Sequence, residues 1–415
     1  MRRQHLAPLV LAVVVLLVAG LAATGRLPAR HQRTAVTAAT DQALPGHRGP
    51  PGSETWAPWP QALHDAQHSG AATVEGPVTG HVRWTRRLEG NVTPGPVVGA
   101  DGTIYAASNA GVLHALDPAT GADRWTLDGG AAYGIDQSTS PAVLPDGSVL
   151  WPGPHNTLWS VTPAGAVRWQ LALSGTVTSP AATADGDVVV GDSSGRLVGL
   201  RPTASGPGVA WDVELGEGSY GSPVIAADGR TAFQSVVSGV VAVRDGTVLW
   251  RSRAPRATVE VSPAVGPDGT VVIGTNDPFQ YGLDPDDGHV RWTYRRGPWT
   301  YSSPGVTRDG IVYFGDHANR VTGLDAVTGL PIYRHQGSTA RDHPRSIGIW
   351  TSVLVDAAHR VYVGTRQGLV YAADRDGKRL WQVDAGATVD SYPALTADGT
   401  LLVGVTDGRL LAIGD

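Results

Sequence analysis

Several short stretches of this sequence have the residue types and spacing of catalytic or ligand-binding motifs. Residues 191–195 (Gly-Asp-Ser-Ser-Gly) match the pattern of a serine nucleophile, but that motif requires a strand–turn–helix elbow. Residues 216–221 (Gly-Glu-Gly-Ser-Tyr-Gly) match a phosphate-binding loop, which requires a helix N-terminus after it. We expect strands rather than helices around both stretches, so we interpret them as turns or links between strands.

Possible metal-binding residues are equally sparse. Residues 284–288 (Asp-Pro-Asp-Asp-Gly) faintly resemble a calcium loop but are too short and lack its terminal glutamate. His64 and His68 have the spacing of a metal-binding pair on a helix, but no third ligand is evident. The chain has no cysteine, which excludes disulfides, thiolate nucleophiles, zinc ribbons and iron–sulfur clusters. We therefore predict no catalytic residue and no metal site.

Composition indicates many short strands separated by tight turns. Glycine (54 residues) and proline (30) together make up about a fifth of the 415 residues, only 17% are charged, and there are 13 tryptophans against 3 phenylalanines. Such a composition does not suit a coiled coil, a helical bundle or a charged disordered chain. The net charge of −5 does not attract a negatively charged phosphate backbone, so we expect no nucleic-acid partner.

The N-terminal residues have the pattern of a targeting segment. Arg2 and Arg3 precede an apolar run at residues 6–23, which is typical of a signal peptide or of an N-terminal membrane anchor. Both alternatives stay open, and the lack of cysteine excludes a lipoprotein anchor. We assign residues 1–30 to this segment and residues 31–55, which show no hydrophobic periodicity, to a disordered linker. The remainder is therefore expected outside the cytoplasm, either anchored to the membrane through the N-terminal segment or secreted.

The rest of the chain repeats. Eight similar starts recur along it, five of them a Ser-Pro step, and seven are followed by an Asp-Gly step. Asp-Gly between apolar runs predicts a hairpin, and we expect a type I′ turn in which both residues have φ > 0. Each unit then continues with an alternating strand, a glycine-containing turn, another strand, an Asp-x-x-x-Gly turn and a closing strand. The starts lie at residues 95, 140, 179, 222, 262, 303, 352 and 392.

An aromatic residue marks the closing strand of each unit. The spacings run from 39 to 48 residues, and 335 positions shared among eight units give about 42, the length of a four-stranded propeller blade. We predict an all-β, eight-bladed propeller, because antiparallel blades of this size bury both faces only by stacking. The strand at residues 81–88 has no repeat before it, so it should join the C-terminal blade and close the ring. The marking residues are Trp84, Trp125, Trp169, Trp211, Trp250, Trp292 and Trp381, with Tyr333 in the remaining unit.

The unit at residues 115–125 (Ala-Leu-Asp-Pro-Ala-Thr-Gly-Ala-Asp-Arg-Trp) resembles the tryptophan-docking repeat of the quinoprotein, or PQQ-like, β-propellers. The lead-in at residues 59–70 is also similar to that family, so the resemblance covers residues 56–415. A WD40 propeller fits poorly, because Trp211-Asp212 is the only Trp-Asp step and the Gly-His partner is missing.

The resemblance implies two different functions. Quinoprotein dehydrogenases oxidise alcohols or sugars with PQQ and Ca²⁺, using an adjacent cysteine pair and carboxylate and amide calcium ligands. This chain has no cysteine, and we align no such calcium set with it. BamB-like members of the family are scaffolds that use the same propeller without a cofactor. We therefore expect a non-catalytic, cofactor-free binding or scaffold module, with a PQQ- and Ca²⁺-dependent dehydrogenase as the alternative.

Ligand-binding residues are expected on one face, where the links between blades and the turns between second and third strands emerge. Their aromatic and charged residues suit a planar or sugar-like small molecule, or an extended peptide of a partner protein. The structural alternative is that the tryptophans wedge between blades and the charges are solvated. The longest link spans residues 334–351. The candidate residues are Asp136, Tyr220, Glu260, Trp299, Tyr301, Arg345, Trp350 and Asp390.

Overall fold

The computed structural model describes residues 55–132, 139–252, 261–297, 301–337 and 348–415. All of them belong to one compact unit, Ala38–Asp415. The predicted targeting segment and all but the last residue of the predicted linker lie outside the described residues. Within the described ranges, no helix is long and apolar enough to cross a membrane.

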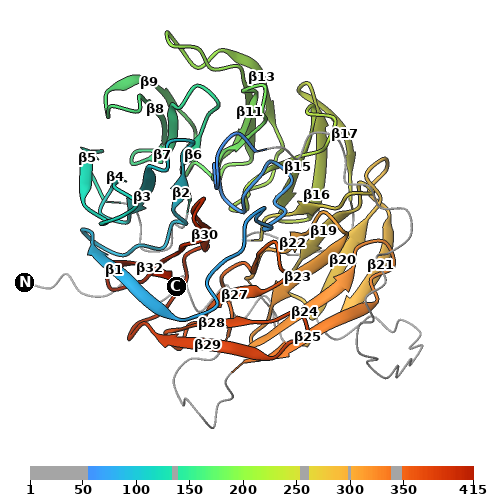
Figure 1. Ribbon diagram of the computed structural model, residues 1–415. Helices are drawn as coiled ribbons and strands as arrows, with labels where there is room; N and C mark the ends of the chain where they lie inside the picture. Colours follow the sequence, from blue (N-terminus) through green and yellow to red (C-terminus); the bar gives the residue numbers. More distant parts are fainter. Residues whose placement is uncertain (1–54, 133–138, 253–260, 298–300, 338–347) are drawn as a thin grey trace, which may run out of the picture. The chain divides into compact units, whose positions relative to one another are not determined.

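Eight four-stranded antiparallel sheets make up the described chain, as the sequence predicts (Figure 1). In seven of them the strands are paired in chain order. The blades are, from 1 to 8: β2 (Val97–Val98), β3 (Ile104–Ser108), β4 (Val112–Leu116), β5 (Asp123–Asp128); β6 (Ala142–Val143), β7 (Val149–Gly153), β8 (Thr157–Val161), β9 (Val167–Ala172); β10 (Ala181–Ala182), β11 (Val188–Gly191), β12 (Arg196–Leu200), β13 (Val209–Glu214); β14 (Val224–Ile225), β15 (Thr231–Val236), β16 (Gly239–Arg244), β17 (Thr247–Arg251); β18 (Ala264–Val265), β19 (Val271–Gly274), β20 (Phe279–Leu283), β21 (Val290–Arg295); β22 (Gly305–Val306), β23 (Ile311–Gly315), β24 (Arg320–Asp325), β25 (Pro331–Gln336); β26 (Leu354–Val355), β27 (Val361–Gly364), β28 (Leu369–Ala373), β29 (Arg379–Asp384); and β30 (Ala394–Leu395), β31 (Leu401–Gly404), β32 (Arg409–Gly414), β1 (His81–Arg87).

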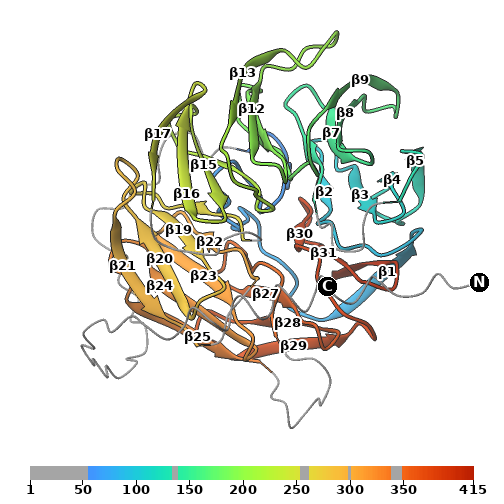
Figure 2. The same ribbon diagram turned by 180° about the vertical axis from the view of Figure 1, so that it is seen from behind.

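The blades are arranged as a ring, with the two-residue first strands toward the centre (Figures 1 and 2). These first strands contact their neighbours: β2 contacts both β6 and β30, and β14 contacts both β10 and β18. The predicted eight-bladed propeller is therefore confirmed.

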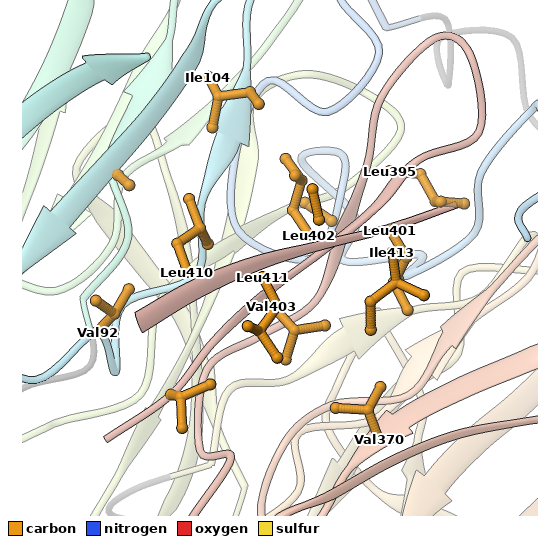
Figure 3. Close-up of a cluster of buried hydrophobic side chains, with 14 of the residues drawn as sticks. Val92, Ile104, Val370, Leu395, Leu401, Leu402, Val403, Leu410, Leu411 and Ile413 are labelled. Carbon is orange, nitrogen blue, oxygen red and sulfur yellow. The ribbon is translucent and has the colours of Figure 1, made fainter. Parts of the chain in front are cut away.

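The second and third strands are buried on both faces, because each blade packs between two others. All residues of β3 and β31 are buried, whereas the outer strands β5 and β29 alternate between exposed and half-buried positions. Leu402 and Val403, successive residues of β31, point to opposite sides of blade 8 (Figure 3). Their cluster includes Ile104 of blade 1 and Val370 of blade 7. This packing explains why the inner strands are continuous apolar runs.

Each blade is fastened to the next by the aromatic residue of its outer strand. In six junctions the indole Nε1 donates to a backbone carbonyl in the third-to-fourth-strand turn of the following blade, over 2.7–3.0 Å. A turn glycine lies under the ring: a Cβ on Gly121, where φ is +70°, would be 2.7 Å from Trp84. Tyr333 donates its hydroxyl to the Asp374 carbonyl at 3.4 Å. The six donors are Trp84, Trp125, Trp169, Trp250, Trp292 and Trp381.

Blade 8 combines strands from distant parts of the sequence. β1 pairs with β32, and Trp84 lies opposite Ala412, which confirms that the strand near residue 81 closes the ring. Asp415 Oδ1 accepts hydrogen bonds from the backbone N–H groups of Val78 and Thr79 and from the Thr79 hydroxyl, over 2.8–3.1 Å.

The same three hydrogen bonds occur within a continuous turn of blade 1. There, Asp117 Oδ1 accepts from the N–H groups of Ala119 and Thr120 and from the Thr120 hydroxyl, over 3.0–3.2 Å. The Asp-Pro-x-Thr-Gly turn on which a tryptophan docks is therefore assembled in blade 8 from Asp415 and residues 77–80. We call this arrangement the split turn.

The Asp-Gly turns differ from the expected type I′ geometry. In all seven, the glycine has φ > 0 but the aspartate does not; Gly102 has a φ of +81°. The Gly102 N–H donates to the Gly99 carbonyl at 3.0 Å, and Asp101 accepts the Thr103 N–H at 3.0 Å. The result is a type I turn followed by a left-handed glycine, in which the carboxylate binds the amide two residues on.

Residues 56–72, which we call the belt, run around the axis at the end where the first-to-second-strand turns lie (Figure 1). In six blades the second residue of the first strand donates its N–H to the belt, over 2.7–2.9 Å. Gln61 binds Ala182 with both ends of its amide, at 2.7 and 3.0 Å. A buried N–H without an acceptor costs about 1–3 kcal/mol, so the belt is part of the fold. The six donors are Val98, Val143, Ala182, Ile225, Val265 and Val355.

The two histidines of the belt do not form a helical pair. His64 and His68 have φ values of +83° and +57°. His68 is buried, and its Nδ1 donates to the Pro263 carbonyl at 3.0 Å. Burial lowers the pKa of His68 to about 4, and the bond to Pro263 and the charge of Asp65 only partly oppose this effect.

Breaking the split turn is expected to destabilise the ring. Asp415→Ala and Thr79→Val should each lower the free energy of unfolding by about 1 kcal/mol, because each removes hydrogen bonds from a docking turn. The double variant should lose less than the sum of the two, since both changes remove the same interaction. Urea unfolding measures all three. Fully additive losses would show that the two side chains are not coupled.

The buried His68 should make the protein sensitive to acid. Because its folded pKa is about 4 and its ordinary pKa is 6.5, the neutral ring stabilises the fold fully above pH 6.5, and this stability is lost as the pH falls toward 4. A pKa difference of this size corresponds to about 3 kcal/mol. Urea unfolding between pH 7 and pH 4 should show a steeper loss for the wild type than for His68→Asn. Parallel pH profiles would contradict this role of His68.

Candidate functional site

The candidate residues that the structure describes lie at one repeated position. Tyr220, Tyr301, Trp350 and Asp390 each stand four residues before the first strand of a blade, on the face opposite the belt. Three of them lie on neighbouring blades, 6, 7 and 8. Tyr220 belongs to blade 4 and is 56% exposed. The other four candidates, Asp136, Glu260, Trp299 and Arg345, lie outside the described residues.

Trp350 is the centre of a stack of side chains at the junction of blades 6 and 7. The Tyr301 ring lies 4.5 Å from the Trp350 ring, centre to centre, and the His317 ring lies 5.4 Å away. The Arg366 guanidinium carbon lies 3.7 Å from the Trp350 ring centre. That distance is well within the range of a cation–π interaction.

Arg366 links the stack to blade 8. Its Nε lies 3.8 Å from Asp390 Oδ1, close enough for an ion pair but too long for a hydrogen bond. Burial raises the pKa of Asp390 above its ordinary value, and the positive charge of Arg366 opposes that rise. Burial and the charge of Arg366 also lower the pKa of His317. The site therefore combines aromatic surface with a fixed cation and a half-buried carboxylate.

Sequence reasoning missed two members of this stack, His317 and Arg366. Both lie two residues after the glycine that ends a second strand, in the turn leading to the third strand. The equivalent residues of other blades include Ser193, Asn276 and Thr406. A comparison of this turn position across the repeats would have singled out Arg366, the only arginine there among the described residues.

Two of the motif-like stretches lie between strands, as interpreted from the sequence. Residues 191–195 form the turn between β11 and β12, where the Gly195 N–H donates to the Asp192 carbonyl at 3.1 Å. Residues 216–221 link β13 to β14 and precede a strand.

One group of side chains in the described ranges has the spacing of metal ligands: Asp284, Asp287 and His289. It overlaps the stretch at residues 284–288. The group lies in the third-to-fourth-strand turn of blade 5, and its members are already engaged: Asp284 pairs with Arg291 at 2.8 Å, and Asp287 with His289 at 2.6 Å. The turn thus has its own ion pair and hydrogen bond, and Asp284 occupies the same position as Asp117 in blade 1.

Serine hydroxyls join the blades around the axis. The Ser140 N–H donates to Ser179 Oγ at 2.9 Å, and the Ser222 N–H donates to Ser262 Oγ at 2.8 Å. The repeated Ser-Pro step therefore provides an acceptor for the preceding blade, while proline adds no N–H of its own. Tyr392 takes this serine position in blade 8, and burial raises the pKa of its hydroxyl.

The described residues around the axis do not fit a PQQ–Ca²⁺ site. Calcium in proteins is held by six to eight oxygens, usually including carboxylates. The first strands and their Ser-Pro steps instead present serine hydroxyls that accept hydrogen bonds between blades. Asp390, the only carboxylate among the candidates that the structure describes, is paired with Arg366.

Comparisons with known proteins agree with this architecture. A family model described as outer membrane protein assembly factor BamB matches residues 70–224 and 204–413. The chain belongs to the PQQ-like propeller family. A Mycobacterium tuberculosis protein named Protein Rv3035 is 26% identical over 408 residues, covering 85% of this chain and 91% of that protein.

Two further proteins are similar to this chain. Outer membrane protein assembly factor BamB of Nitrosomonas eutropha is 28% identical over 246 residues, which cover 57% of this chain and 56% of that protein. The solved structure of quinohemoprotein alcohol dehydrogenase from Comamonas testosteroni superposes with a TM-score of 0.68 at 14% identity, covering 86% of this chain and 81% of that one. At this identity, the superposition demonstrates a shared fold alone.

The pairing of Arg366 with Asp390 predicts a measurable titration. Arg366→Gln should raise the pKa of Asp390 further, because it removes the positive charge that opposes burial. Arg366→Lys, which keeps the charge but not the planar stack, should leave the pKa closer to that of the wild type. Carbon-13 NMR of labelled aspartate carboxyls measures both. An unchanged or lower pKa in Arg366→Gln would show that the two groups do not interact.

Proposed function

We propose that this protein is a non-catalytic, extracytoplasmic propeller that binds a partner protein or peptide on the face opposite the belt, without a cofactor. The observation that carries the proposal is the stack of Tyr301, His317, Trp350 and Arg366 beside Asp390. Tyrosine, tryptophan and arginine are the residues that dominate binding energy at protein interfaces, since they combine large rigid surface with directed polar groups.

The belt supports the choice of this face. It occupies the axis at the opposite end, where its backbone and side chains bind the first strands of six blades. On the opposite face, which carries the Trp350 stack, the links and turns are the segments that vary most between repeats. Variable loops on a rigid ring are the usual location of binding residues.

The family supports binding in preference to catalysis. The matching family model and one of the reported relatives carry the name of an assembly factor, which describes a protein that works through partners. The N-terminal pattern of Arg2, Arg3 and the apolar run at residues 6–23 supports a position outside the cytoplasm, with or without a retained membrane anchor.

A titration with PQQ tests the absence of a cofactor. The full chain, purified in detergent, should show no saturable quenching of tryptophan fluorescence by micromolar PQQ, with or without Ca²⁺, because the described axis residues form no calcium site. Thermal unfolding of the same sample confirms that it is folded. Saturable, Ca²⁺-dependent quenching would instead support the dehydrogenase alternative.

Site-specific cross-linking in the producing cells completes this test by locating the binding face. A photo-reactive phenylalanine at Tyr301 should give a discrete cross-linked species, and Arg366→Ala should reduce its yield. The matched control places the same group at Leu330, which is 59% exposed in the turn of blade 6 at the belt end. Equal cross-linking from both positions, or from neither, would contradict the proposed face.

A further inference from the structure

Blade 5 carries polar side chains at two positions that are apolar in the other described blades. The first position is in the third strand, where Gln280 lies opposite Tyr294, the second residue after the docking Trp292. The fourth residue after the docking aromatic is Arg296. Both are buried, with exposed fractions of 0% and 5%. The residues equivalent to Gln280 are Leu113, Leu158, Leu197, Val240, Val321, Val370 and Leu410, and those equivalent to Arg296 are Leu88, Gly129, Leu173, Leu215, Gly337 and Ala385.

Gln280 and Arg296 rise from the same face of blade 5. Gln280 pairs with Tyr294, and Arg296 follows Tyr294 by two residues, so the three side chains point to one side at directly opposite or diagonal positions. That side packs on blade 6. The Tyr294 ring lies 6.2 Å from the Phe314 ring, and Arg320 Nη2 donates to the Arg296 carbonyl at 2.8 Å.

The polar atoms of this pair are only partly used. Arg296 Nη2 donates to the backbone carbonyls of Thr275 and Asp277, the latter at 2.8 Å. Arg296 Nε and Nη1, and both Nε2 and Oε1 of Gln280, have no hydrogen-bond partner in the described part of the chain. Buried polar groups are nearly always hydrogen-bonded, so these four atoms point to an occupant.

Nearby carboxylates do not fill this role. Asp316 is held by Arg320 at 2.7 Å, and Asp277 accepts the Tyr281 hydroxyl at 2.6 Å. Both carboxylates make the electrostatic potential around Arg296 more negative, but neither forms a hydrogen bond with it. Burial lowers the pKa of Arg296 to about 10, so its guanidinium still carries a positive charge at neutral pH.

The unused hydrogen-bonding groups favour an occupant that accepts hydrogen bonds. Arg296 has three unused N–H groups and Gln280 has two, against a single acceptor oxygen. A water molecule supplies donors and acceptors equally, whereas an oxyanion supplies acceptors and the charge that the guanidinium prefers. We propose that the junction of blades 5 and 6 binds a small oxyanion, a carboxylate or a tetrahedral oxyanion, between Arg296 and Gln280. This proposal does not depend on the partner-binding function.

Calorimetric titration of the dialysed full chain tests the site. Sodium acetate represents the carboxylates, and sodium sulfate and sodium phosphate represent the tetrahedral oxyanions, all at an ionic strength held constant with sodium chloride. We expect saturable binding of one class at one site per chain. Arg296→Leu should weaken it about 10- to 100-fold, the effect of losing hydrogen bonds to a charged group. Gln280→Leu should weaken it less.

Arg295→Leu is the matched control, because it removes the same charge from the exposed preceding residue, the last one of β21. It should bind the anion as the wild type does. The double variant Gln280→Leu/Arg296→Leu restores the apolar pair of the other blades, so it should fold even if Arg296→Leu alone does not, and it should not bind. No saturable binding to the wild type, or equal binding to the double variant, would overturn the proposal.

Discussion

The docking of one aromatic ring onto the turn of the next blade is the interaction on which the whole ring depends. A four-stranded blade cannot bury both of its faces, and its outer strand has nothing beyond it. The indole solves both problems, because its ring covers a turn glycine of the following blade while its N–H satisfies a backbone carbonyl there. Gly121 has no side chain for this reason as well as for its left-handed φ. Each docking fixes the position of one blade relative to the next, so the angle between blades repeats and the ring closes.

Closure imposes a second constraint, which the two ends of the described chain meet together. Asp415 and Thr79 rebuild the turn that Trp381 requires, and β1 supplies the outer strand that carries Trp84. The belt that leads to β1 then provides acceptors for the N–H groups of six first strands. Because those groups face the axis and have no further strand to pair with, the belt completes the sheets from the inside. The end of the axis where the belt lies therefore has a structural role.

The residues proposed to bind ligands lie where single blades differ from the repeat pattern. The turn and link positions of blades 6 to 8 carry the Trp350 stack, and the core of the junction between blades 5 and 6 carries Gln280 and Arg296. At the positions of Gln280 and Arg296, the other described blades hold apolar residues. Both departures place arginine next to buried or half-buried surface, where desolvation strengthens its electrostatic interactions. A rigid repeat tolerates such changes, since the docking turns that hold the blades lie at the other end of the outer strands.

The eight blades, their strand order and the closing role of residue 81 onward could be predicted from the sequence, because each repeat records its own hydrogen-bonding and packing needs in Asp-Gly, Ser-Pro and tryptophan steps. Tyr301, Trp350 and Asp390 were also accessible to sequence reasoning, since they stand at one repeated link position. The contacts that His317 and Arg366 make with Trp350 were not, because His317 comes from a turn of blade 6 and Arg366 from a different loop of blade 7 than Trp350. The belt, the split turn and the Gln280–Arg296 pair likewise depend on contacts across the axis or between blades. Local pattern determined each blade, and the stacking of blades decided which side chains came together.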